Sequence, residues 1–288
     1  MGRYGFSRIA GGLSIAAALS ATAWVATLAA PSFPRLADKS ANAIPVDVEL
    51  VLAVDVSYSM DPDEQALQRD GYVQALTSRE FMQALREGAN GKIAVTYVEW
   101  AGQHDQRVIV PWRLIEGPES ADAVASEIAL APLRRASRTS ISGGLQFAKT
   151  LFGNSGYRGL RRVIDVSGDG PNNAGALVAP TRDEVVASGI TINGLPIMLK
   201  RGYAGSLDIE KLDIYYEDCV IGGPGAFVVP IRERAKFIEA TRTKLVLEVA
   251  GRQPEAKVIP ASAEKPRVSC TIGEKMWQER WGGGMDFR

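Results

Sequence analysis

A short apolar run near the start of the chain, VELVLAVD at residues 48–55, decides the fold. Apart from Glu49 and the final Asp55, every position in this run is apolar. Such a run is typical of a strand that is buried on both faces, as in a parallel sheet covered by helices. It therefore predicts a strand inside an α/β domain.

Outward from this strand, segments that predict strands and helices alternate along the chain. Further strands are predicted at residues 93–100, 107–112, 163–167, 190–197 and 226–229, and helices at residues 61–86, 120–130, 142–152, 181–188, 207–216 and 231–249. The long connections demand crossovers, so we expect a Rossmann-like open, mostly parallel sheet with helices on both faces. The short loop at residues 101–106 predicts a hairpin, which supplies one antiparallel edge strand.

The start of the chain has the pattern of an export signal. Arg3 and Arg8 form a positive region, residues 9–30 are free of charge, and an A-x-A cleavage pattern ends at Ala43. The apolar stretch is also about long enough to span a bilayer. Residues 1–43 are therefore a signal peptide or a retained N-terminal anchor, and in either case the body of the protein is exported to the periplasm or cell envelope.

Composition excludes several classes of function. The 288 residues hold 33 basic and 33 acidic side chains, and removing the four basic residues and one acidic residue of the leader leaves 29 and 32. The chain has no excess of basic residues, so its composition does not favour nucleic-acid binding. One histidine and two cysteines exclude a His-rich metal site, a Cys₄ zinc site and an iron–sulfur cluster within one chain.

The two cysteines predict a disulfide. Cysteines in an exported domain most often pair, so we expect a bond between Cys219 and Cys270. This bond would tie the polar C-terminal tail, residues 251–288, to the preceding domain at residues 46–250.

Polar loops follow the predicted strands at the edge where open α/β sheets bind ligands. Five residues on three of these loops carry oxygen donors: Asp55, Ser57, Ser59, Thr139 and Asp169. Two carboxylates and three hydroxyls suit Mg²⁺, with Mn²⁺ or Ca²⁺ as alternatives, better than zinc or copper. The alternation in D-x-S-x-S lets Asp55, Ser57 and Ser59 reach a common point from one turn.

These residues resemble the metal-ion-dependent adhesion site of von Willebrand factor type A (VWA) domains in order and approximate spacing. The resemblance covers roughly residues 46–250. The runs at residues 163–173 and 218–225 resemble an uncharacterised exported bacterial branch of that superfamily. One departure is Gly168, which replaces the commoner threonine before Asp169.

The resemblance implies a metal-dependent protein-binding module and no enzymatic activity. Ser57, Ser59 and, with a ligand engaged, Thr139 would bind the ion directly, while Asp55 and Asp169 would bind directly or through water. An Asp or Glu from a protein partner would complete the coordination. We expect no nucleic-acid partner, and membrane contact only through the N-terminal anchor.

Two other functions remain open at this stage. A haloacid-dehalogenase-like, Mg²⁺-dependent phosphohydrolase also has an Asp after its first strand, but it needs a second Asp where this chain has Ser57, and a nearby Lys. An exported scaffold could hold a metal for stability alone. A Ser–His–Asp hydrolase would require His104 as its base, and the chain has no G-x-S-x-G elbow.

Several polar residues near these loops have structural explanations. Asp61 and Glu64 suit the reciprocal capping of a helix that begins between them. Asp165 lies inside an apolar strand, where an unpaired carboxylate is costly, so it needs a structural partner. Asn172 and Asn173 are expected to form a turn.

Overall fold

Strand β1 (Ile44–Asp55) lies at the centre of a five-stranded sheet. It pairs in parallel with β2 (Ile93–Trp100) on one side and with β4 (Tyr157–Gly168) on the other. Beyond β4 lies the parallel strand β5 (Thr191–Pro196), and beyond β2 lies the antiparallel β3 (Gln106–Ile115). The order β3-β2-β1-β4-β5 confirms the predicted mostly parallel α/β sheet with one antiparallel edge strand.

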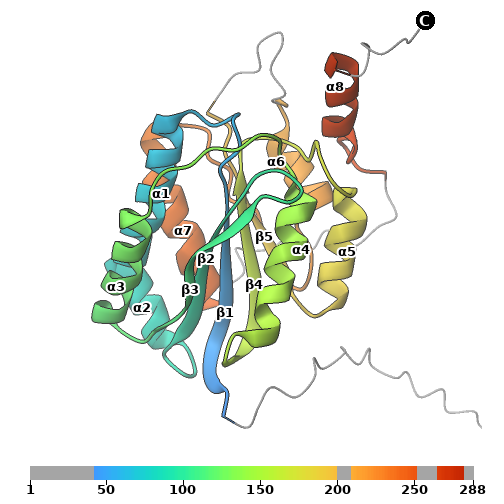
Figure 1. Ribbon diagram of the computed structural model, residues 1–288. Helices are drawn as coiled ribbons and strands as arrows, with labels where there is room; N and C mark the ends of the chain where they lie inside the picture. Colours follow the sequence, from blue (N-terminus) through green and yellow to red (C-terminus); the bar gives the residue numbers. More distant parts are fainter. Residues whose placement is uncertain (1–41, 200–208, 252–264, 282–288) are drawn as a thin grey trace, which may run out of the picture. The chain divides into compact units, whose positions relative to one another are not determined.

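This computed structural model describes residues 42–199, 209–251 and 265–281 (Figure 1). The chain divides into two units, Met1–Ser32 and Phe33–Arg288, and all described residues belong to the second. The predicted leader, residues 1–43, therefore lies outside the described residues except for its last two. Within the described ranges, no helix is both long enough and apolar enough to cross a membrane.

Helices cover both faces of the sheet, as predicted (Figure 1). They are α1 (Pro62–Leu76), α2 (Arg79–Glu87), α3 (Pro118–Leu130), α4 (Ile141–Leu151), α5 (Val178–Ala187), α6 (Leu212–Tyr215), α7 (Phe237–Ala250) and α8 (Ile272–Trp281). Short 3₁₀ turns occur at Phe152–Asn154 and Arg234–Lys236, and a π-helical turn at Tyr216–Val220 follows α6.

Alternate residues of β1 enter two separate hydrophobic cores. Leu50 and Leu52 pack with residues of α1, α2, α3 and α7, whereas Val51 and Ala53 pack with residues of α4, α5 and α6. All four side chains are fully buried. Burial on both faces explains why the run is apolar at almost every position instead of at every second one.

Two predicted helices have other bounds in the structure. The helix predicted at residues 61–86 is two helices, because Ser78 ends α1 and its hydroxyl accepts a bond from Phe81 N–H as the cap of α2. The helix predicted at residues 231–249 begins only at Phe237, because Ile231 forms a bridge with Ile197 beside the sheet.

The C-terminal part departs further from the prediction. The strand predicted at residues 226–229 makes only isolated bridges to β5, such as Val228 with Gly194. Of the helix predicted at residues 207–216, the structure has the short α6. Residues 207 and 208 of that prediction lie outside the described ranges. Helix α8 was not predicted in the polar tail.

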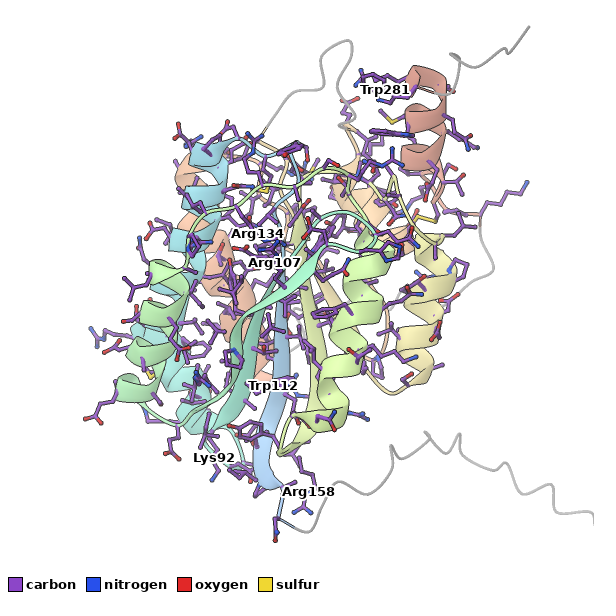
Figure 2. All side chains as sticks on the ribbon, in the orientation of Figure 1. Lys92, Arg107, Trp112, Arg134, Arg158 and Trp281 are labelled. Carbon is purple, nitrogen blue, oxygen red and sulfur yellow. A yellow bond between two sulfur atoms is a disulfide. The ribbon has the colours of Figure 1, made fainter. Side chains whose placement is uncertain are left out.

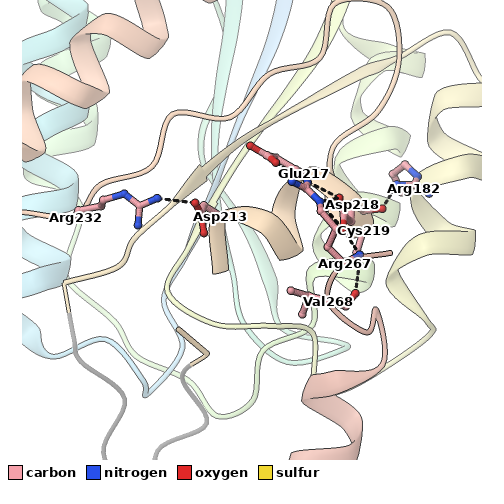
Figure 3. A network of polar contacts seen from close by, with 8 residues as sticks. All are labelled: Arg182, Asp213, Glu217, Asp218, Cys219, Arg232, Arg267 and Val268. Carbon is pink, nitrogen blue, oxygen red and sulfur yellow. Dashed lines mark hydrogen bonds and ion pairs between the residues drawn. The ribbon is translucent and has the colours of Figure 1, made fainter. Parts of the chain in front are cut away.

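The Cys219–Cys270 disulfide is present and is reinforced by charged contacts. The Arg267 guanidinium lies 2.6 Å from Glu217 Oε2 and 2.6 Å from Asp218 Oδ1, so both acids beside Cys219 hold the segment that leads to Cys270 (Figure 3). The start of the tail is therefore tied to the π-helical turn by a covalent bond and by ion pairs.

We predict that Cys270→Ser lowers the free energy of unfolding by about 4 kcal/mol, because the bond closes a loop with a sequence separation of 51 residues in the unfolded chain. Urea unfolding measures the change. The double variant Cys219→Ser/Cys270→Ser should match the single variant, and an unchanged midpoint in both would show that the bond adds no stability.

A buried ion triad joins β4 to α7. Lys244 Nζ lies 2.6 Å from Asp165 Oδ1 and 2.7 Å from Glu248 Oε1, and Asn193 Nδ2 donates to the other oxygen of Glu248. All four residues are buried. Lys244 is thus the structural partner that the position of Asp165 requires. Burial raises the pKa of Asp165 to about 6, and the Lys244 charge acts in the opposite direction.

We predict that Lys244→Met lowers the free energy of unfolding at neutral pH by about 3–5 kcal/mol, because two buried carboxylates lose their cation. Without the Lys244 charge the pKa of Asp165 lies above its wild-type value of about 6, so protonation of Asp165 as the pH falls stabilises the folded variant more than the folded wild type. The loss should therefore be smaller at pH 5 than at pH 8 in urea titrations. Lys236→Met, in an exposed pair with Glu239, should change little at either pH. A loss independent of pH would contradict this account.

Candidate metal centre

The loop after β1 folds around Asp55. The backbone N–H of Ser57 donates to Asp55 Oδ1 at 2.7 Å, an Asx-type turn that reverses the chain directly after the strand. The hydroxyls of Ser57 and Ser59 lie 2.7 Å apart, while Tyr58 between them is 59% exposed. The alternation predicted from D-x-S-x-S therefore holds: the two serine hydroxyls gather at one point and the intervening side chain faces outward.

The loop after β4 meets the loop after β1. Ser59 Oγ donates to Asp169 Oδ1 at 2.6 Å across 110 residues of sequence. The two loops are close because β1 and β4 are adjacent parallel strands, whose carboxyl ends fall at the same edge of the sheet. Asp55, Ser57 and Asp169 are buried, and Ser59 is half-buried.

The third loop, which enters α4, is held by two asparagines. Thr139 N–H donates to Asn173 Oδ1 at 2.9 Å, and Asn173 N–H donates to the Thr139 carbonyl at 2.8 Å. Asn172 Oδ1 accepts a bond from Ser142 N–H in the first turn of α4. Asn172 and Asn173 therefore do more than form a turn: they join the loop of Asp169 to the loop of Thr139. Their position directly after Gly-Asp-Gly-Pro at the ligand-binding edge of the sheet is the sequence signal for this role.

The charged form of the Asp55 carboxyl is strongly disfavoured by its surroundings. Burial raises the pKa of its carboxyl well above the ordinary value, the Asp169 charge raises it further, and the N–H groups of Ser57 and Asp169 act in the opposite direction. Within the described part of the chain, no group at bonding geometry pairs with Asp55 Oδ2. A buried oxygen without a donor, next to a second carboxylate, is an environment that a cation would stabilise.

Tyr216, which sequence analysis did not identify, lies against this carboxylate. A Cβ atom on Gly168 would lie 2.9 Å from both Asp55 Oδ2 and Tyr216 Oη, so the two oxygens occupy the space that a side chain there would need. Burial, followed by the Asp55 charge, raises the pKa of the Tyr216 phenol and keeps it neutral. Gly168 in place of threonine is therefore required by the packing of Tyr216. No sequence signal links Tyr216 to Asp55.

The other acids near the loops have the structural roles predicted for them. Asp61 Oδ1 accepts from Glu64 N–H, and Glu64 Oε2 accepts from Asp61 N–H, in a reciprocal capping box at the start of α1. Among the described residues, no group of three or more His, Cys, Asp or Glu side chains could hold a metal. A cation at these loops would depend on two carboxylates and three hydroxyls, a donor set that fits a hard divalent ion.

The family model described as "Protein of unknown function (DUF1194)" matches residues 45–253. The chain belongs to this family. No curated protein matches the sequence.

This member of the DUF1194 family shares its α/β fold, VWA-like as predicted, with solved structures. Proximal thread matrix protein 1 from the mussel byssus is 16% identical, with a TM-score of 0.53 over 72% of this chain and 49% of that one. A second structure of that protein, described as having a zinc-occupied MIDAS motif, is 19% identical, with a TM-score of 0.50 over 72% and 48%. The pilus adhesin SpaC from Lactobacillus rhamnosus GG is 14% identical, with a TM-score of 0.52 over 72% and 31%. The DUF1194 chain thus spans half or less of each of these proteins.

We predict that Asp55→Asn stabilises the protein in EDTA by about 1–2 kcal/mol, because the amide keeps the bond from Ser57 N–H and removes a buried charge beside Asp169. Urea unfolding in EDTA measures this gain. The control Asp63→Asn, exposed in the first turn of α1, should give no gain. If Asp55→Asn is destabilising in EDTA, the carboxylate is held by protein groups alone.

Proposed function

We propose that this protein is a non-enzymatic, divalent-metal-dependent protein-binding module whose ion is held by Asp55, Ser57, Ser59, Thr139 and Asp169. One observation carries the proposal: Asp55 is buried beside Asp169, and no group in the described chain satisfies its Oδ2 oxygen. The hydroxyls of Ser57 and Ser59 and the Asp169 carboxylate form a continuous set of contacts of 2.6–2.7 Å next to it.

The donor set supports Mg²⁺ as the preferred ion, with Mn²⁺ or Ca²⁺ as alternatives, because every ligand is a hard oxygen. Two carboxylates equal the charge of a divalent cation, but the remaining ligands are neutral hydroxyls, which bind the ion weakly. The bound ion would therefore attract a further anionic oxygen, which a partner's Asp or Glu can supply. The role of the chain would be to hold the ion and to present it to the partner.

Structural relatives support the proposal at the level of the fold. One structure of the mussel protein is described as having a zinc-occupied MIDAS motif, so a site on this fold accepts a divalent cation. SpaC is described as a pilus adhesin, which is consistent with protein binding as the task of this fold.

Location outside the cytoplasm is part of the proposal. The Cys219–Cys270 disulfide is consistent with an oxidising compartment. The basic and apolar leader at residues 1–43 supports export to the periplasm or cell envelope, through either a cleaved signal or a retained anchor.

We predict that Mg²⁺ raises the melting temperature relative to EDTA. A concentration about a hundredfold above Kd adds about 2.7 kcal/mol of stability, which corresponds to several degrees for a domain of this size. Asp55→Ala should abolish the shift, whereas the nearby Asp63→Ala should keep it. The metal site is refuted if wild type and Asp55→Ala respond equally.

We predict that the immobilised protein retains a partner from an envelope extract in Mg²⁺ and releases it in EDTA. Asp55→Ala should retain none, and Asp63→Ala should retain as much as the wild type. Equal recovery under all conditions would contradict metal-dependent binding. A magnesium-dependent melting temperature without any retained partner would assign the metal a structural role.

A further inference from the structure

A strand-like segment runs along the outer side of the loop after β1. Tyr58 N–H donates to the Ala136 carbonyl at 2.9 Å, and Ala136 N–H donates to the Val56 carbonyl at 3.0 Å. These two bonds hold residues 134–139 against the D-x-S-x-S loop. Arg135 and Arg138, on either side of Ala136, are therefore neighbours of the proposed metal ligands.

Arg135 is fixed on the exposed ring of Tyr58. Its guanidinium carbon lies 5.3 Å from the ring centroid, and its Nη2 donates to the Tyr58 carbonyl at 2.7 Å. Tyr58 lies between Ser57 and Ser59 and is 59% exposed. One cation–aromatic pair thus covers the outside of the loop that would hold the ion.

Arg138 forms a second pair, with Trp277 of α8. The guanidinium carbon lies 3.5 Å from the ring centroid, and Trp277 packs on Trp281, which is 63% exposed. Arg138 has a φ of 75°, a conformation that side-chain-bearing residues rarely adopt, and the next residue, Thr139, is bonded to Asn173. The surroundings therefore hold Arg138 in place.

Helix α8 is attached to the same loops at its first turn. Asn172 Nδ2 donates to Glu274 Oε1 at 2.8 Å, and the disulfide at Cys270 lies two residues before the helix. The exposed ring of Trp281 lies at the other end of α8 (Figure 2). Helix α8 thus carries two tryptophan side chains and is connected to the loops of Thr139 and Asp169.

The two arginines differ in their charge balance from other arginines that the structure describes. Arg134 pairs with Glu99 and Asp105, and Arg113 pairs with Glu127. Within the described residues, Arg135 and Arg138 stack on aromatic rings, and neither forms an ion pair with a carboxylate. A stacked guanidinium keeps its planar N–H donors available for carboxylates.

The acids that follow the loop in sequence are engaged at the start of α1. Asp61 and Glu64 bond to each other's backbone in the capping box of α1, which begins after the loop. The positive side of the loop is therefore the side of residues 135–138.

We propose that Tyr58, Arg135, Arg138, Trp277 and Trp281, the arginine–aromatic rim, bind a protein segment whose metal-binding Asp or Glu is flanked by further acidic residues. This inference rests on the proposed function and names the chemistry of its partner. Tyr, Trp and Arg are the residue types that dominate binding energy at protein interfaces, and two unpaired arginines beside the ion favour an acidic segment.

Synthetic peptides test the rim directly. Fluorescein-labelled peptides carry one central Asp flanked on both sides by Glu, by Gln or by Lys, and fluorescence anisotropy measures their binding to the full chain in saturating Mg²⁺. We expect the Glu-flanked peptide to bind about tenfold more tightly than the Gln-flanked one, and the Lys-flanked peptide to bind most weakly. EDTA should abolish binding of all three.

Charge-removing variants locate the effect. Arg135→Gln should reduce the preference for Glu over Gln about threefold, and Arg135→Gln/Arg138→Gln should remove it. Arg158→Gln makes the same charge change at an exposed position at the opposite end of the sheet and should leave the preference intact (Figure 2). If Arg158→Gln lowers the preference as much, the effect is one of net charge and the rim is not the binding surface.

Mn²⁺ binding, followed by electron paramagnetic resonance, separates the two hypotheses. Arg135→Gln should bind Mn²⁺ like the wild type, which also shows that the variant is folded. A wild type that does not bind Mn²⁺ refutes the proposed function. Normal Mn²⁺ binding with equal affinities for the three peptides, or with no peptide bound, overturns the acidic-partner inference and leaves the metal site standing.

Discussion

The Asp55 carboxylate is completely buried at the carboxyl end of the central strand, and the surrounding loops are arranged around its charge. The N–H of Ser57 satisfies one oxygen, and no group at bonding geometry among the described residues satisfies the other. The neighbouring Asp169 adds repulsion. A buried carboxylate in such a place costs stability unless a positive charge joins it. The divalent cation of the proposed function would offset this local cost.

The same sheet holds a second buried carboxylate with a different solution. Asp165 lies on β4 beside Leu52 of β1, and the ammonium group of Lys244 from α7 neutralises it permanently. Asp55 has no such internal cation among the described residues. The two buried carboxylates thus differ: Asp165 has a fixed internal cation that joins α7 to the sheet, whereas Asp55 has an open position at the proposed metal site. This difference supports the proposal that the costly burial of the Asp55 carboxylate serves metal binding.

The sequence contains enough local information to predict the framework of this protein. The apolar run of β1 and the alternation of strands and helices follow from burial. Four of the five oxygen-bearing residues lie at or directly after the ends of parallel strands, and Thr139 lies in the loop that enters α4. Three features carry no local signal. The break at Ser78 depends on two bonds of one hydroxyl inside an otherwise helical pattern, and the isolated bridges at residues 222–231 depend on the edge of β5. The packing of Tyr216 against Asp55 joins residues that are far apart in sequence.

Helix α8 is the clearest case of structure that depends on distant contacts. Its ten residues bury only Gly273, so no amphipathic pattern predicts it, and it is held by the disulfide at Cys270 and by the Asn172–Glu274 bond. Cys219 lies in the π-helical turn that begins at Tyr216, the residue beside Asp55. One covalent bond therefore connects the two elements that contact the metal loops from different directions. Such a bond orders α8 before any partner binds. Binding therefore does not lose the conformational entropy of placing the tryptophans of α8, and a modest surface can bind with useful affinity.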